Sequence, residues 1–248
     1  MSQNGPALLA PVIAHRGASA DAPENTLAAL NLAAEHGASC VEIDVSISAD
    51  NIAFVHHDDQ LDRCTSGSGL LCEHTAEQLD QLDASKGMEG FEGEPLPRLS
   101  AVFELLVSRK LGLNLEIKPR AGLEESTVEA ICQLVESQWP NHLPLVFSSF
   151  CRHSLQLAKD RLPNISRGLL VGDVPDDWPS LIKQFECRNL HCDGARLTAD
   201  QTTQLLEANV GVYCYTVNDV DKAKVLLEYG VHGVFTDYPK RLSSSLSI

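Results

Sequence analysis

Several features that would mark other classes of protein are missing from this sequence. The first 11 residues contain no basic side chain, and Pro6 and Pro11 interrupt their short apolar run, so we expect no secretory signal peptide. No apolar stretch approaches the roughly 20 residues that a membrane-spanning helix needs. We therefore expect a soluble, cytoplasmic protein with no stable membrane association.

Basic residues and paired cysteines are also scarce. The chain has 19 Lys and Arg against 34 Asp and Glu, which gives a formal net charge of -15. The resulting negative field repels polyanions and therefore argues against nucleic acid as a partner. None of the 8 cysteines forms a C-x-x-C pair, and several lie inside apolar segments, which favours reduced thiols.

The order of apolar segments predicts the fold class. No G-x-G-x-x-G follows the first apolar run, so a dinucleotide site is disfavoured. Apolar strands alternate with helix-period segments along all 248 residues, which indicates an α/β protein built as a (β/α)8 TIM barrel in a single domain. The expected strands are residues 12–15, 40–45, 113–117, 145–149, 168–171, 190–195, 212–216 and 233–236. The expected helices are residues 26–35, 124–137, 153–160, 178–185, 199–208 and 220–229.

Two segments depart from this alternation. Residues 46–110, between the second and third strands, contain a Gly-, Glu- and Pro-rich loop at 86–97 and are expected to form a small insertion over the barrel mouth. The serine-rich tail, residues 242–248, is expected to be mobile.

Three acidic residues stand at the ends of adjacent expected strands. Because side chains alternate along a strand, Glu42 and Asp44 share the face opposite Val41 and Ile43, and Glu116 enters the same mouth from the next strand. Any one of these acids could simply meet solvent or pair with an arginine. Three together at the carboxyl end of a barrel predict a metal site, and an all-oxygen set favours Mg²⁺ or Ca²⁺ over zinc.

Two histidines are expected to reach the same mouth. His15 ends the first strand, and a hairpin turning at about residue 50 brings position 57 opposite position 43. The spacing alone does not choose between His56 and His57. Two imidazoles beside three acids suit acid and base catalysis, although both could instead be metal ligands.

Arg16 and Lys118 add positive charge to this rim. They either neutralise the acids or contact a phosphate oxygen. Three carboxylates, these two side chains and a divalent cation carry a summed charge of about +1, which one phosphodiester anion cancels. The charge count favours a phosphate contact.

At this point the motifs resemble a known family, that of the glycerophosphodiester phosphodiesterases, in its cytosolic bacterial form. The matching segments are HRG at 15–17, PENT at 23–26, VEIDV at 41–45, HD at 57–58, LDR at 61–63, LEIKP at 115–119, FSSF at 147–150, YTVN at 215–218 and VFTDYP at 234–239. They follow one another over nearly the whole chain. The joint resemblance is therefore specific, whereas HRG alone would be weak.

The resemblance implies a metal-dependent hydrolase of lipid and glycerol metabolism, which converts glycerophosphodiesters to sn-glycerol 3-phosphate and an alcohol. It implies His15 and His57 as the acid/base pair, and it thereby selects His57 over His56. It further implies Glu42, Asp44 and Glu116 as metal ligands and Arg16 and Lys118 as phosphate contacts. Tyr215 is expected to contact substrate where a tryptophan is frequent in the family.

Other interpretations of the function remain open from the sequence. A lipid phosphodiesterase of the lysophospholipase D type would need an apolar collar at the mouth. A barrel lyase or aldolase could use Lys118 as a Schiff base, and a non-catalytic binding protein is a third alternative. The sequence leaves open the alcohol headgroup, a homodimer, and whether water or the glycerol 2-hydroxyl is the nucleophile.

Overall fold

The computed structural model describes residues 5–7 and 9–246, and over these residues the strands form one closed sheet. The strand order is β1-β9-β8-β7-β6-β5-β4-β2-β3, and the pairing of β1 with β2 closes the barrel. Every neighbouring pair is parallel except β2 with β3. The parallel strands are β1 (Val12–His15), β2 (Cys40–Ile47), β4 (Gly112–Ile117), β5 (Leu145–Ser149), β6 (Ser166–Val171), β7 (Asn189–Asp193), β8 (Gly211–Tyr215) and β9 (Gly233–Thr236).

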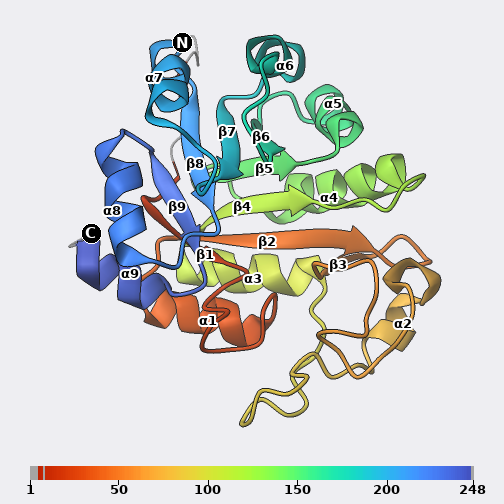
Figure 1. Ribbon diagram of the computed structural model, residues 1–248. Helices are drawn as coiled ribbons and strands as arrows, with labels where there is room; N and C mark the ends of the chain where they lie inside the picture. The colour runs from red at the N-terminus through yellow and green to blue at the C-terminus, as the bar shows by residue number, and fades with distance from the viewer. Residues whose placement is uncertain (1–4, 8, 247–248) are drawn as a thin grey trace.

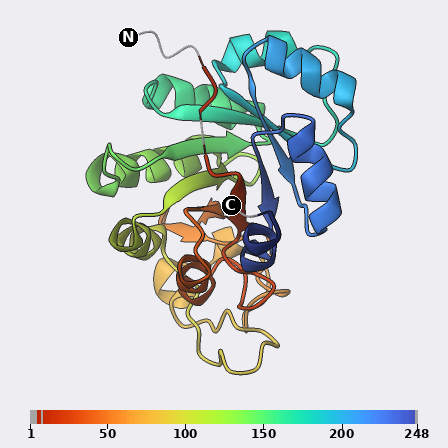
Figure 2. The same ribbon diagram turned by 90° about the vertical axis from the view of Figure 1, so that its left-hand side faces the viewer.

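Helices surround this barrel, as Figures 1 and 2 show. They are α1 (Leu27–Glu35), α3 (Leu99–Arg109), α4 (Glu124–Gln138), α5 (Arg152–Arg161), α6 (Trp178–Phe185), α7 (Ala199–Glu207), α8 (Val220–Glu228) and α9 (Pro239–Leu246). Alternate strand residues such as Val41, Ile43 and Val45 are fully buried against the helix layer. The opposite alternation faces the barrel axis, so the predicted TIM barrel is confirmed.

The segment expected to be an insertion divides into two parts. Its first part holds β3 (Ala53–Val55), the 3-10 turn η1 (Leu71–Glu73) and the short helix α2 (Ala76–Leu79), and it has its own small apolar core that includes Phe54 and Leu61. Its last part is α3, which packs beside α1 in the barrel's outer layer. Helix α3 is not among the expected helices, although Leu99, Val102 and Leu106 bury one face at helical spacing.

The expectation of a mobile tail is wrong for residues 242–246. These residues belong to α9, which packs against β1 and α8. Leu242 is fully buried, and Leu246, one turn later, packs on the same apolar cluster. This apolar spacing of four residues fixes the helix despite its three serines. Residues 247 and 248 lie outside the described residues.

The predicted hairpin after β2 is confirmed. Strand β3 runs antiparallel to β2 with Val45 opposite Val55 and Ile47 opposite Ala53. Asn51 turns the chain at φ 61°, a left-handed conformation that asparagine tolerates. The same register, continued by two residues, brings position 57 level with position 43, so the hairpin delivers a histidine to the barrel mouth.

Among the described helices, none is both long and apolar enough to cross a membrane.

Candidate active site

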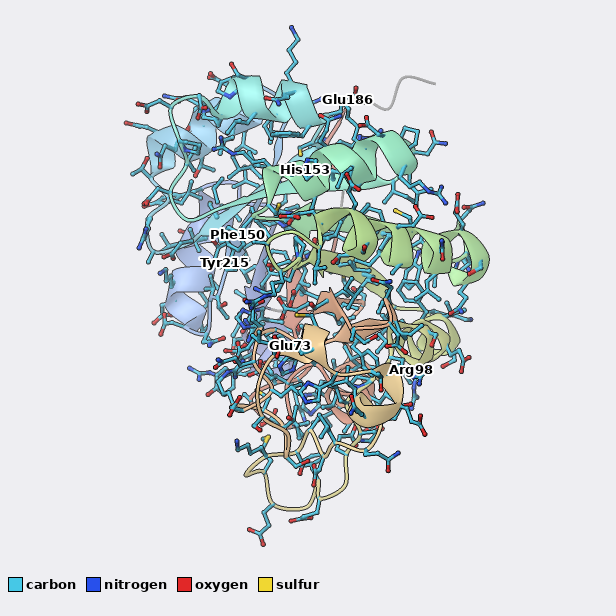
Figure 3. All side chains as sticks on the ribbon, turned by 90° about the vertical axis from the view of Figure 1, so that its right-hand side faces the viewer. Glu73, Arg98, Phe150, His153, Glu186 and Tyr215 are labelled. Carbon is cyan, nitrogen blue, oxygen red and sulfur yellow. The ribbon has the colours of Figure 1, made fainter. Side chains whose placement is uncertain are left out.

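A cavity of about 300 Å³ opens at the carboxyl ends of the parallel strands. Charged residues line one side and apolar residues line the other. Figure 3 looks toward this end of the barrel and labels Phe150 and Tyr215, which lie next to each other on the apolar side. The lining residues are His15, Arg16, Glu42, His57, Asn114, Glu116, Lys118, Phe150, Leu170, Tyr215, Thr216 and Phe235.

Three carboxylates converge at the base of the charged side. Glu42 and Asp44 extend from β2, and Glu116 extends from the neighbouring position on β4, directly opposite Asp44 in the sheet register. One oxygen from each lies within 4.8 Å of the others. This is the cluster that the alternation of the two strands predicted, and its oxygen-only donors suit a hard divalent cation.

The electrostatics of the cluster agree with a site built for a cation. Burial raises the pKa of Glu42 well above its usual range, and the charges of Asp44 and Glu116 raise it further. Burial and the neighbouring Asp44 also raise the pKa of Glu116, to about 7. Nearby, the amide oxygen of Asn114 is buried and accepts no hydrogen bond among the described residues. Excess buried acceptors of this kind fit a bound metal ion.

The loop after β1 contacts both Asp44 and Glu42 of the acidic cluster. Arg16 Nε lies 3.2 Å from Asp44 Oδ2, and the backbone N–H of Arg16 donates to Glu42 Oε2 at 3.0 Å. Asn25 Nδ2 donates to Asp44 Oδ2 at 2.9 Å while its own Oδ1 accepts from the Asp44 N–H at 3.3 Å. Next to it, Thr26 accepts from the Ala29 N–H as the N-cap of α1. The PENT segment therefore both starts a helix and contacts the acidic cluster.

His15 is oriented by an acid from the far end of the chain. Its Nδ1 lies 2.7 Å from Asp237 Oδ1, which leaves Nε2 on the side of Glu42, 3.9 Å from its Oε2. Burial alone would raise the pKa of Asp237, but hydrogen bonds from His15 and Asn218 outweigh it and hold the pKa at about 2. An ionised Asp237 fixes the imidazole so that Nε2 faces the cavity.

His57 is the histidine of the hairpin that lines the cavity. Its Nδ1 lies 2.5 Å from Asp58 Oδ1. Burial lowers the pKa of His57, the charges of Arg16 and Lys118 lower it further, and Asp44 partly opposes them. The adjacent His56 is buried and its Nε2 contacts the Gln60 carbonyl instead. The structure thus brings His15 and His57 to one mouth and leaves His56 in the hairpin.

The two remaining predicted side chains lie on opposite sides of the cavity. Lys118 Nζ is 3.4 Å from Glu116 Oε1 and 3.8 Å from Asp44 Oδ1, so it pairs with two of the acids. Tyr215 donates its hydroxyl to the Val171 carbonyl at 2.7 Å. Its ring meets the half-exposed ring of Phe150 edge to face, with centroids 6.0 Å apart. Together the two rings form the apolar wall.

Several residues of the site were not assigned from the sequence. Asp237 and Asn218 lie within matched motifs, which offered a signal. Asp237, however, contacts His15 across 222 residues of sequence, and Asn218 donates to Asp237 across 19. Asn114 could have been found, because it shares a face of β4 with Glu116. The hydrogen bonds by which Arg63 links Asp58, next to His57, to Glu24 could not, because Glu24 lies on a separate loop.

Comparison with known proteins places the chain among its relatives. The model of the glycerophosphoryl diester phosphodiesterase family matches residues 15–241, which span every site residue described above. The chain belongs to this family. The predicted assignment to the glycerophosphodiester phosphodiesterases, and hence to the enzymes, is confirmed.

Individual relatives match over almost their full lengths. A glycerophosphodiester phosphodiesterase of Caldanaerobacter subterraneus subsp. tengcongensis is 33% identical, with 93% of this chain and 95% of the relative covered. One from Bacillus altitudinis is 32% identical, with 93% and 95% covered. The structure of an Oleispira antarctica phosphodiesterase in complex with the product sn-glycerol-3-phosphate superimposes with a TM-score of 0.94, at 40% identity and with 97% and 98% of the two chains covered.

Proposed function

We propose that this phosphodiesterase hydrolyses soluble glycerophosphodiesters to sn-glycerol 3-phosphate and an alcohol, with a divalent metal and a pair of histidines. The observation that supports this most is the meeting, in one cavity, of two acid-oriented imidazoles, two cationic side chains and the carboxylates of Glu42 and Glu116, which cluster with the buried Asp44. The product bound by the Oleispira antarctica phosphodiesterase supports the same substrate class.

The acidic cluster is the proposed metal site. Glu42, Asp44 and Glu116 would be the ligands, and the oxygen-only set favours Mg²⁺ or Ca²⁺. A bound divalent cation would supply Lewis-acid stabilisation of the charge on the phosphate's non-bridging oxygens. Arg16 and Lys118 flank the cluster and would bind the same phosphate by charge-assisted hydrogen bonds.

The two histidines would share the proton transfers. Both present Nε2 toward the cavity because their Nδ1 atoms contact Asp237 and Asp58. One would remove a proton from the nucleophile, which is either water or the glycerol 2-hydroxyl, and the other would give a proton to the departing alkoxide. The lowered pKa of His57 keeps its ring neutral near neutral pH, a state that can accept a proton.

The apolar wall would hold the carbon skeleton of glycerol. The Tyr215 ring and Phe150 face the charged half of the cavity, and a three-carbon alcohol fits between them better than a second charged group would. An intact phospholipid would need a wider apolar surface at the mouth. The alternative Schiff-base role of Lys118 is disfavoured, because its ammonium group is engaged in two ion pairs.

The test is the release of sn-glycerol 3-phosphate from glycerophosphocholine, glycerophosphoethanolamine and glycerophosphoglycerol, with and without chelator. We expect turnover of all three, lost in chelator and restored by Mg²⁺ or Ca²⁺. Full turnover after thorough chelation, with metal analysis showing no bound ion, would refute the metal requirement. Comparable rates on micellar lipid or DNA would refute the substrate class.

The single-domain organisation, the cytoplasmic location and the homodimer stay predictions.

A further inference from the structure

A continuous chain of charged contacts joins His57 to Arg16 around the rim of the cavity. One carboxylate oxygen of Asp58 lies 2.5 Å from His57 Nδ1, and the other accepts a hydrogen bond from Arg63 Nε at 2.6 Å. Arg63 then donates to both oxygens of Glu24, through Nη1 at 2.6 Å and Nη2 at 2.9 Å. Glu24 Oε1 in turn accepts from Arg16 Nη1 at 2.7 Å.

The central member of this chain links two separate parts of the fold. Arg63 and Asp58 lie in the segment after β3, whereas Glu24 and Arg16 lie in the loop between β1 and α1. The planar guanidinium uses three nitrogens to reach two carboxylates at once, which a lysine ammonium on a flexible stem cannot reproduce. Arg63 therefore sets the distance between the loop that carries His57 and the loop that carries Arg16.

The bridged carboxylates are firmly ionised. Burial alone would raise the pKa of Glu24, but the hydrogen bonds from Arg63 and the charge of Arg16 outweigh it and hold the pKa at about 2. Hydrogen bonds from Arg63 also lower the pKa of Asp58 below its usual range, against the effect of burial. The ionised Asp58 therefore also contacts His57, a proposed acid/base group, and the ionised Glu24 also contacts Arg16, a proposed phosphate contact.

A purely structural role for Arg63 is the alternative. The segment after β3 has its own apolar core, in which Phe54, Leu61, Leu71 and Leu79 are fully buried. The Arg63 side chain itself is 47% exposed and adds little to that core. Exposed ion pairs contribute little to stability, typically about 0–1 kcal/mol. Removal of the guanidinium is therefore expected to disturb the site and spare the fold.

We propose that Arg63 is a positioning residue, which holds Asp58 against His57 and Glu24 against Arg16 and so fixes the imidazole relative to the phosphate-binding side chain. The proposal rests on the function proposed above, since it gives His57 and Arg16 roles on one substrate. Arg63 touches neither the cavity nor the acidic cluster, so its effect on the reaction must pass through its two carboxylate partners.

Arg63→Ala is the main test, with Arg161→Ala as the matched control. Arg161 also bridges two carboxylates, Glu129 and Glu136, and is similarly exposed at 35%, but it lies on the outer helices. We expect Arg63→Ala to lower kcat for glycerophosphocholine about 10- to 100-fold, the range for groups that orient a functional side chain. Arg161→Ala is expected to leave kcat within about twofold of wild type, as suits a surface change.

Two further measurements separate positioning from a general loss of structure. Guanidinium ion should restore part of the activity of Arg63→Ala, because the exposed site can admit it, whereas Arg63→Lys should stay impaired. In a His57→Ala background, Arg63→Ala should add little to the loss of kcat, because its main target is already gone. A kcat for Arg63→Ala within the range of the control, or a full additional loss in the His57→Ala background, would overturn the proposal.

A spectroscopic readout keeps this proposal distinct from the proposed function. The His57 imidazole nitrogen resonances, identified by their absence in His57→Gln, should shift in Arg63→Ala and remain in place in Arg161→Ala. Unshifted resonances in Arg63→Ala would overturn the positioning role even if the wild type hydrolyses glycerophosphodiesters. A wild type without such turnover would instead refute the proposed function, while shifted resonances would still support the contact.

Discussion

Replacement of Glu42 by glutamine tests whether the acidic cluster costs stability in order to bind a cation. The substitution replaces a buried carboxyl group, whose ionised form is disfavoured by burial and by the neighbouring acids, with a neutral amide of the same shape. The amide oxygen can still accept the hydrogen bond that Arg16 N donates to Glu42 Oε2 at 3.0 Å. The variant therefore changes charge while it preserves the packing of the loop after β1.

The size of the effect follows from the spacing of the carboxylates. Two full charges at 4.8 Å, the largest separation within the cluster, repel by about 3.5 kcal/mol at an effective dielectric constant of about 20. Arg16 and Lys118 offset much of this repulsion, and Glu116, with its pKa of about 7, is largely ionised only above that pH. We expect Glu42→Gln to raise the free energy of unfolding of the metal-free protein by about 1–2 kcal/mol at pH 8.

In the metal-bound state we expect the wild type to have the higher free energy of unfolding and Glu42→Gln the lower. At a metal concentration of about 100 times Kd the wild type gains about 2.7 kcal/mol, whereas a variant that has lost a ligand gains much less. Urea unfolding with chelator and with saturating Mg²⁺ or Ca²⁺ measures both differences. Glu104→Gln, an exposed change on α3, should stay within about 0.5 kcal/mol of wild type in both conditions. The reasoning is refuted if Glu42→Gln destabilises the protein equally in chelator and in metal.

Three further predictions concern the loop after β1 and the two histidines. Gly17→Ala should destabilise the fold by about 2–4 kcal/mol in urea unfolding and reduce turnover, because φ is +85° and a Cβ would lie 2.6 Å from the Ala29 carbonyl carbon. Glu24→Gln should be less stable than wild type at pH 7, and this deficit should shrink as pH falls from about 4.5 toward 2, because the depressed pKa of Glu24 makes its ion pairs stabilising only while it is ionised. His15→Ala and His57→Ala should each lower kcat about 10²–10⁴-fold on a glycerol diester. With a p-nitrophenol-type leaving group, which departs as a stable anion, only the variant that lacks the acid should recover; equal recovery in both, or none in either, would contradict separate roles.

The barrel could be predicted because its determinants are local. Each strand carries its own apolar alternation, and the expected strands lie within two residues of the observed ones. The hairpin after β2 could also be predicted, because a turn near residue 50 followed by an apolar return segment indicates an antiparallel partner for β2. The spacing alone did not choose between His56 and His57. The same alternation placed Glu42 and Asp44 on the axial face before any contact was known.

Contacts between distant loops could not be predicted in this way. The pairing of His15 with Asp237 joins the first strand to the last, and it exists only because the barrel closes. The bridge from Arg63 to Glu24 depends on where the segment after β3 packs, which its spacing in the sequence does not specify. Helix α3 escapes prediction for another reason: a Gly- and Pro-rich loop precedes it, and the composition of the whole segment indicates one irregular insertion.

The loop after β1 shows where local rules give way to the site. Arg16 and Asn25 both adopt left-handed backbone conformations, with φ 57° and 58°, which cost energy for Arg16 and less for Asn25, because asparagine tolerates this region. Each conformation is held by a contact with the acidic cluster, through the Arg16 N–H on Glu42 and the Asn25 amide on Asp44. The carboxylates themselves repel one another. The strained backbone of the loop and the repulsion between the buried carboxylates have one explanation if the site binds a cation and an anionic substrate. A bound cation would supply the positive charge that the carboxylates lack, and the anionic substrate would then balance the remaining positive charge.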